Sequence, residues 1–292
     1  MKMNDLPACV DDFLSANDFS HHTVKAIKAD LRKFVSWFVN ANGERFDPAR
    51  VTVRDVADFR EHLARVRRQS VATVNRALVS IRRFLGHLVK SGAVSANAAE
   101  AVKELRRMPI QPKGLSASEV RKILREIELR QDYKAGACIG LMLHAGLRAS
   151  EVVGLELDDV TVAPRSGQVV CRHGKGNKQR AVPLSVEARR VVQAYLETRP
   201  PVACQAVFIG ERGPLTYSGL RAICSKYAAI TGVAFTAHKL RHTFAHRYLQ
   251  QTSNDLVGLA QILGHESLNT TSIYTRRGQD ELQASIDDLR YE

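Results

Sequence analysis

The sequence lacks the features of a membrane or secreted protein. No run approaches the ~18 consecutive apolar residues of a membrane-spanning helix, and the first twelve residues contain no apolar stretch of the signal-peptide type. The five cysteines are odd in number, widely scattered and never arranged as Cys-x-x-Cys, so they indicate neither a disulfide framework nor a zinc knuckle. We therefore expect a cytoplasmic protein with reduced thiols.

Acidic residues are also scarce. The chain has 30 Asp and Glu against 43 Lys and Arg, which gives a formal net charge of +13. This excess favours a polyanionic partner, and nucleic acid is the leading candidate. We find no dense carboxylate cluster suited to Mg²⁺ and no Gly-x4-Gly-Lys-Ser/Thr loop for ATP, so we expect chemistry that requires no metal and no cofactor.

Strand-like alternation is absent from the first hundred residues, which predicts an all-α domain over 1–105. Ser20, Thr52, Ser70 and Asn97 are expected to be helix N-caps. A segment with two prolines, a glycine and three cations predicts a linker over 106–114. The expected helices are Leu6–Ala16, His21–Asn40, Val53–Arg65, Val71–Lys90 and Ala98–Leu105.

The second domain, over 115–292, is predicted to be rich in helices and to contain a small antiparallel sheet. Ser116 and Glu119 form a capping box at the start of a helix, and Gly174–Asn177 is a turn between two Val-rich segments. The expected strands are 159–163, 168–172 and 180–184, with 206–209 as a further extended piece. The expected helices are 133–145, 186–196, 217–230, 238–249, 255–263, 270–274 and 280–289.

Six side chains of this domain are suited to phosphoryl transfer. Two guanidiniums can bind the non-bridging oxygens of a phosphate, an ammonium and imidazoles can transfer protons, and a phenol can attack phosphorus. Two of the six lie three residues apart on one helical face, so a single phosphate could touch both. The six are Arg148, Lys175, His238, Arg241, His265 and Tyr274.

In this order and spacing the sequence resembles the tyrosine recombinase (phage integrase) family, and within it the two-domain, Xer-like recombinases. The motifs are Arg148 followed at the third position by Glu151, the Gly-Lys-Gly turn, His-x-x-Arg and Gly-His-x8-Tyr. The resemblance covers essentially the whole chain. It implies a SAM-like core-binding domain, a mainly α catalytic domain, and a covalent 3′-phosphotyrosyl intermediate.

Each residue also has an ordinary interpretation. Glu151 is expected to orient Arg148, although it could be a solvated helix charge, and Lys178 is a rival to Lys175 for protonating the leaving oxygen. His238, His242 and His246 recur every four residues and could line a metal site, but Arg241 would repel a dication. We expect no metal ligands.

Basic residues of the first domain are candidates for binding DNA, although charge runs are usually solvated. They are Arg67, Arg68, Arg76, Arg82 and Arg83. Near the end of the chain Leu282, Ile286 and Leu289 form a narrow apolar stripe, which could dock on a neighbouring protomer or pack on its own domain.

The sequence therefore predicts a site-specific recombinase that acts on double-stranded DNA as a tetramer on two sites. Two rival functions are left open. One is a type IB topoisomerase, which uses similar side chains but reseals the same strand. The other is a non-catalytic DNA-binding regulator.

Overall fold

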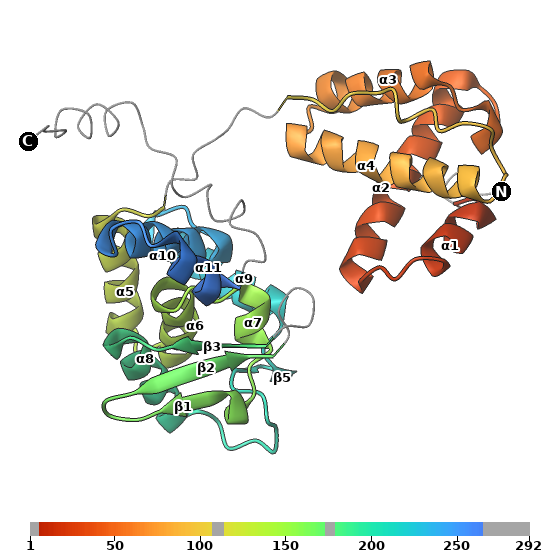
Figure 1. Cartoon of the computed structure of the whole chain (residues 1–292). Coiled ribbons are helices and arrows are strands. Elements are labelled where there is room, and N and C mark those ends of the chain that lie inside the picture. The colour runs from red at the N-terminus through yellow and green to blue at the C-terminus, as the bar shows by residue number, and fades with distance from the viewer. Residues whose placement is uncertain (1–5, 107–113, 173–178, 265–292) are drawn as a thin grey trace, which may run out of the picture. The chain divides into compact units, whose positions relative to one another are not determined.

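A computed structural model describes residues 6–106, 114–172 and 179–264. The chain divides into two compact units, Met1–Pro109 and Ile110–Glu292 (Figure 1). No helix among the described residues has both the length and the hydropathy needed to cross a membrane.

The described elements of the first unit are all helical, as predicted. Ser20 and Ser70 accept hydrogen bonds from the backbone N–H groups of Thr23 and Thr73, and Thr52 forms a capping box with Asp55. The elements are α1 (Ala8–Ser15), α2 (His21–Asn42), the 3₁₀ turn η1 (Pro48–Arg50), α3 (Val53–Glu61), the π-helical turn η2 (His62–Val66) and α4 (Val71–Lys90).

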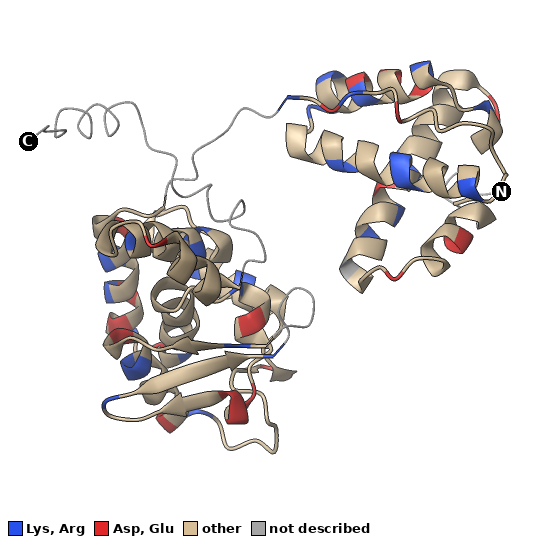
Figure 2. Cartoon of the chain, in the orientation of Figure 1, with Lys and Arg blue, Asp and Glu red and all other residues tan. Residues whose placement is uncertain are grey.

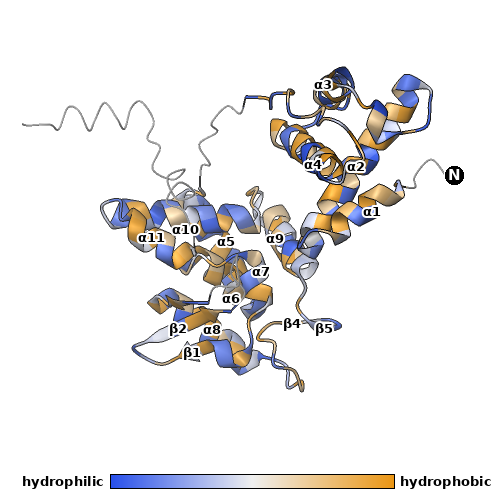
Figure 3. Ribbon diagram, turned by 45° about the vertical axis from the view of Figure 1, so that its right-hand side comes forward, coloured by the Kyte–Doolittle hydropathy of each residue, from blue (hydrophilic) through white to orange (hydrophobic). Residues whose placement is uncertain are grey.

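Each helix of this unit presents apolar residues to a common core and polar residues elsewhere (Figure 3). Phe34 packs edge-to-face against Phe59 and Phe46, with ring centroids 5.2 and 5.9 Å apart. The buried carboxylate of Asp30 on α2 accepts two hydrogen bonds from Arg76 on α4, at 2.8 and 2.9 Å. This pair fastens the two longest helices of the unit together.

The predicted helix Ala98–Leu105 is wrong, because side chains take the place of helical hydrogen bonds in this segment. Asn97 caps the backbone N–H of Ala99 in a local turn, and Arg82 donates to the carbonyls of Ala99 and Val102. Asn75 pairs with both the N–H and the carbonyl of Leu105 at 2.9 Å. The segment therefore runs along α4 as a strap without regular secondary structure.

The second unit combines helices with the predicted small antiparallel sheet and with a second, two-stranded sheet that was not predicted. Nearly all of α6 is buried, and it packs against α8 and α10. The helices are α5 (Ala117–Leu129), α6 (Tyr133–His144), α7 (Ala149–Val153), α8 (Val186–Thr198), α9 (Tyr217–Thr231), α10 (Ala237–Gln251) and α11 (Leu256–Leu263), with a 3₁₀ turn η3 (Leu157–Asp159).

The larger sheet has the strand order β1-β2-β3. Its strands are β1 (Val160–Val162), β2 (Gly167–Cys171) and β3 (Arg180–Pro183), and Cys171 pairs with Arg180 at the end nearest to residues 173–178 in the chain. A second sheet joins β4 (Ile209–Gly210) to β5 (Gly213–Pro214). The expected helices over 270–274 and 280–289 lie outside the described residues, as does most of the expected linker.

Candidate active site

The short helix α7, whose range is not among the expected helices, positions the first of the predicted catalytic residues. Arg148 is its N-cap and Glu151 its third residue. The Glu151 carboxylate accepts from the backbone N–H of Arg148 at 2.7 Å and from its Nη1 at 2.8 Å. Glu151 is buried, whereas the Arg148 side chain keeps 32% of its surface exposed. The predicted orienting contact is therefore present.

Arg180, the first residue of β3, contacts the same carboxylate and was not predicted. Its Nη1 and Nη2 donate to the two oxygens of Glu151 at 2.8 and 2.9 Å, in the planar, two-point geometry that only arginine provides. The Arg180 side chain is 12% exposed. The signal for it was weak, because an arginine that opens a Val-rich strand is usually a solvated edge residue.

Arg241 comes from α10 and is almost completely buried. Its Nη1 donates to the carbonyl of Gly146 at 2.6 Å and lies 3.8 Å from Glu151. Gly146 has a φ of +66°, and a Cβ there would come within 2.5 Å of Phe244 and 2.9 Å of Leu263. A glycine is thus required at the position that presents this carbonyl.

The three arginines also bind the end of α11. The last carbonyls of a helix lack partners within it, and the helix dipole favours cations there. Three successive carbonyls each accept from a different arginine: Ile262 from Arg180 at 2.7 Å, Leu263 from Arg241 at 2.8 Å, and Gly264 from Arg148 at 3.4 Å. Gly264 ends the helix in the left-handed conformation, with a φ of +62°.

Glu151 is ionised in this environment. Burial alone would raise its pKa, but the hydrogen bonds from Arg180 and from the backbone of Arg148, and the charges of both arginines, lower the pKa to about 2. One negative charge thus faces three positive charges. The site carries an excess of positive charge, which suits it to binding an anion.

His238, one helical turn before Arg241, is exposed, and its ring packs edge-to-face on that of His242 at 4.0 Å between centroids. Burial, Arg241 and Arg148 lower the pKa of His238. Burial and His238 lower the pKa of His242 to about 4. Both imidazoles are therefore neutral at neutral pH, and a neutral imidazole can accept a proton.

Lys175, its rival Lys178, His265 and Tyr274 lie outside the described residues. The structure places the positions that flank them: β2 and β3 lie before and after residues 173–178, and Gly264, the C-cap of α11, directly precedes His265. Arg148, Glu151, His238 and Arg241 are brought together, and Arg180 joins them. The roles of all of these residues stay predictions.

The five basic residues proposed for DNA binding differ in their surroundings. Arg67, Arg68 and Arg83 are exposed. Arg76 binds the carboxylate of Asp30. Arg82 binds backbone carbonyls of the strap and, at 3.4 Å, the side chain of Glu104 within it. Figure 2 shows the basic residues spread along α2 and α4 of this unit.

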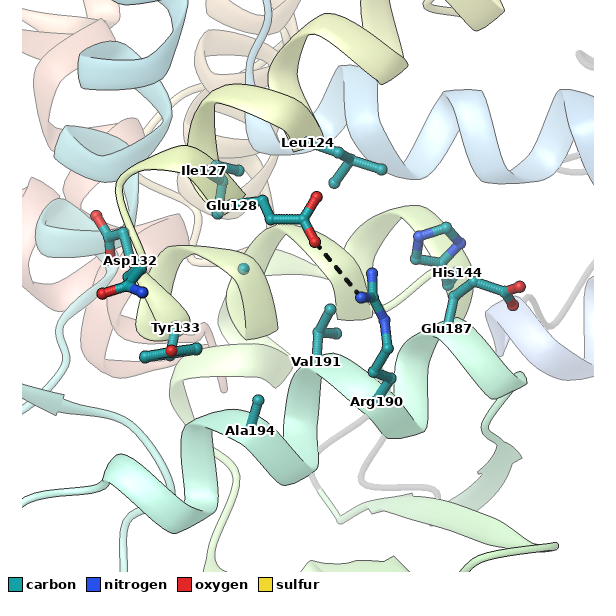
Figure 4. A pocket seen from close by; sticks show the side chains of 12 residues that line it. Leu124, Ile127, Glu128, Asp132, Tyr133, His144, Glu187, Arg190, Val191 and Ala194 are labelled. Atoms are coloured by element: carbon teal, nitrogen blue, oxygen red, sulfur yellow. Dashed lines mark ion pairs between the residues drawn. The ribbon is translucent and has the colours of Figure 1, made fainter.

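A separate pocket of about 340 Å³ lies between α5, α6 and α8 of the second unit. Figure 4 shows Glu128 and Arg190 facing each other across it, 3.7 Å apart. Its lining includes none of the predicted site residues, so the arginine cluster, and not this cavity, is the candidate active site.

Comparison with known proteins shows the family of the chain. Residues 113–281 match the model of the "Phage integrase family", and residues 10–92 match "Phage integrase, N-terminal SAM-like domain". The chain belongs to the phage integrase family. Arg148, Glu151, Arg180 and Arg241 of this integrase-family chain all fall within the first of these matches.

The curated relatives of this integrase-family chain are recombinases. It is 32% identical to tyrosine recombinase XerD of Listeria monocytogenes serotype 4b (strain F2365), over 94% of both chains. It is also 32% identical to tyrosine recombinase XerC of Pelobacter propionicus, over 92% of this chain and 89% of the relative. The protein is accordingly an enzyme of the tyrosine recombinase type.

Solved structures share its fold. XerH bound to a palindromic difH substrate, in a post-cleavage complex, matches with a TM-score of 0.76 at 21% identity, over 95% of this chain and 83% of the other. A dimer of lambda integrase bound to a COC' core site matches with a TM-score of 0.74 at 16% identity, over 94% of this chain and 96% of the other.

Proposed function

We propose that the protein is a site-specific recombinase that cleaves and rejoins double-stranded DNA through a covalent 3′-phosphotyrosyl intermediate at Tyr274. The observation that supports this most directly is the gathering of Arg148 and Arg241 around one buried carboxylate, with positive charge in excess.

The chemistry needs such a cluster. A DNA phosphodiester is anionic, and its pentavalent transition state concentrates negative charge on the equatorial oxygens. Arginine remains protonated throughout and can bind two oxygens at once. Arg148 and Arg241 would therefore stabilise the transition state, and His265 would donate a further hydrogen bond to a non-bridging oxygen.

Proton transfers fall to the remaining residues. The phenol of Tyr274 must lose its proton to attack phosphorus, and the depressed pKa of His238 keeps this imidazole available as the acceptor. Lys175 would protonate the departing 5′-oxygen. The phosphotyrosyl link retains the energy of the phosphodiester, so a 5′-hydroxyl of a second duplex can reverse the step without ATP, metal or other cofactor.

The partner is double-stranded DNA with specific sites, and strand exchange between two sites implies a homotetramer in the synaptic complex. Contacts between protomers through the C-terminal segment 282–289 are part of the proposal, as is a cytoplasmic setting. Arg67, Arg68 and Arg83 are exposed and available to phosphates of the duplex.

The test begins by sequencing the DNA to which the protein becomes covalently joined in its host. A duplex with this sequence, nicked beside the scissile phosphate so that the released fragment diffuses away, should accumulate a protein–DNA adduct with the wild-type protein. Tyr274→Phe should form no adduct, because only the nucleophilic oxygen is removed, and should bind the same DNA equally well. An adduct with Tyr274→Phe would refute the assignment of the nucleophile.

A plasmid assay separates recombination from simple relaxation. Plasmids that carry two of the trapped sites should yield exchanged products, and plasmids without the site should stay supercoiled. Relaxation of any supercoiled plasmid without exchange would instead favour the topoisomerase alternative.

A further inference from the structure

The arginine cluster contains one member that the proposed chemistry does not use. Arg180 is mostly buried, and each of its three nitrogens donates a hydrogen bond to a group of the protein: two to the oxygens of Glu151 and one to the carbonyl of Ile262. These bonds use three of its five N–H donors. Its most direct contribution passes through the groups that it holds.

These groups are the anchors of the two arginines that would meet the phosphate. Glu151 Oε1 accepts from Arg148 and from Arg180, each at 2.8 Å. Arg241 lies near the other oxygen and is bonded to Leu263, the neighbour of the Ile262 that Arg180 holds. A shift of Glu151 or of the end of α11 would move both Arg148 and Arg241.

We propose that Arg180 is a positioning residue. It fixes Arg148 and Arg241 by binding the Glu151 carboxylate that both of them face, and by holding the end of α11 against β3. This inference rests on the proposed function, because it gives Arg180 a role only if Arg148 and Arg241 stabilise a phosphoryl transition state. Without Arg180, the single negative charge of Glu151 would be shared between the two other arginines alone and would draw their guanidiniums inward.

Lysine cannot take this place. A lysine ammonium is a single point on a flexible stem, and it cannot span both carboxylate oxygens and a carbonyl on a third side. Arg180→Lys keeps the charge but loses the geometry, and Arg180→Met loses both while keeping similar bulk.

The experiment measures the rate of adduct formation in a single turnover on the nicked duplex described above, together with DNA affinity and circular dichroism. A displacement of catalytic groups by about 1 Å typically costs on the order of 10²-fold. We expect Arg180→Met to lower the rate by about 100-fold and Arg180→Lys by about 10-fold, with DNA affinity little changed. Arg172→Met is the matched control: Arg172 directly follows the paired strand β2 and binds the buried Asp159, and its loss should leave the rate near that of the wild type.

Two readouts distinguish positioning of the arginines from general damage to the hairpin. A duplex with sulfur in place of the leaving 5′-oxygen needs no proton from a general acid, because a thiolate is a good leaving group. It should rescue Lys175→Ala and not Arg180→Met. In addition, Glu151→Gln combined with Arg180→Met should be no slower than the slower single variant, since both act through one contact.

A native circular dichroism spectrum with an unchanged rate in Arg180→Met would overturn the inference. So would rescue of Arg180→Met by the sulfur duplex, or full additivity in the double variant. If Arg180→Met fails to fold, Arg180→Lys provides the same comparison. Tyr274→Phe is tested in a protein that keeps Arg180. An adduct with Tyr274→Phe would refute the proposed function, whereas an unchanged rate in Arg180→Met would refute only this inference.

Discussion

A buried carboxylate bound to arginine occurs in both units, and the two surroundings differ in charge. In the first unit Asp30 meets one guanidinium, that of Arg76, and the hydroxyl of Ser80. In the second, Glu151 meets Arg148, Arg180 and Arg241. The first arrangement is neutral and joins two helices. The second leaves two positive charges uncompensated.

The difference separates a structural ion pair from a site prepared for an anion. Excess positive charge in a partly buried cluster destabilises the empty protein through repulsion, and a bound phosphate would relieve it. A neutral pair gains nothing from such a ligand. Substitutions at the two carboxylates and their partners can test this contrast.

The largest effect on stability is expected for Glu151→Gln. The folded-state pKa of Glu151 is about 2, below the ordinary value of 4.5. As the pH falls, this carboxylate is therefore protonated in the unfolded chain before it is protonated in the folded protein. The stabilisation is complete above pH ~5 and is lost as the pH falls towards 2; its pH-dependent part is about 3 kcal/mol. Urea unfolding followed by circular dichroism between pH 7 and 3.5 should show a steeper loss in the wild type than in Glu151→Gln. Parallel curves would contradict this electrostatic account.

A smaller effect is expected for Arg76→Met, which leaves Asp30 buried without its cation. Half of the Arg76 side chain is exposed, so the cost should fall below that of a fully buried pair, at about 2 kcal/mol. Trp37 is the only tryptophan of the chain and belongs to the first unit, so its fluorescence reports the unfolding of that unit. Replacing Asp30 by Leu in the same chain should recover much of the loss. No change in the Trp37 transition would show that the pair is not structural.

The smallest effect on stability is expected for Arg83→Gln. Arg83 is exposed on α4 and lines the same surface hollow as Arg76; its side chain forms no hydrogen bond or ion pair with the described residues. If it contacts one phosphate, the slope of log affinity against log salt should fall by about 0.9, with the Trp37 transition unchanged. A salt slope equal to that of the wild type would remove Arg83 from the DNA contacts.

Elements with strong local signals could be predicted from the sequence. The bounds of α4 were predicted correctly, because a Ser N-cap precedes a long amphipathic repeat. The three strands of the larger sheet also appear near their expected positions. The strap over 98–105 was predicted as a helix because its hydrogen-bond partners, Asn75 and Arg82, are distant in sequence and invisible to a local pattern.

The site was predictable as a set of chemical groups and only partly as a structure. Arg148, Glu151 and Arg241 were predicted from motifs that resemble those of the family, and they do meet. Arg180 could not be found from periodicity, because its role depends on the packing of β3 against the end of α11. A five-residue helix such as α7 is too short to produce a periodic signal.

Gly146 illustrates how a mutational survey of this enzyme could mislead. Its φ of +66° and the tight approach of Phe244 leave no room for even a methyl group. Replacement by alanine would displace the carbonyl that accepts a hydrogen bond from Arg241. Activity would then fall although no side chain had been removed. An alanine scan would then mark position 146 as if it touched DNA. As long as Arg241 binds this carbonyl, only glycine satisfies the requirement at position 146.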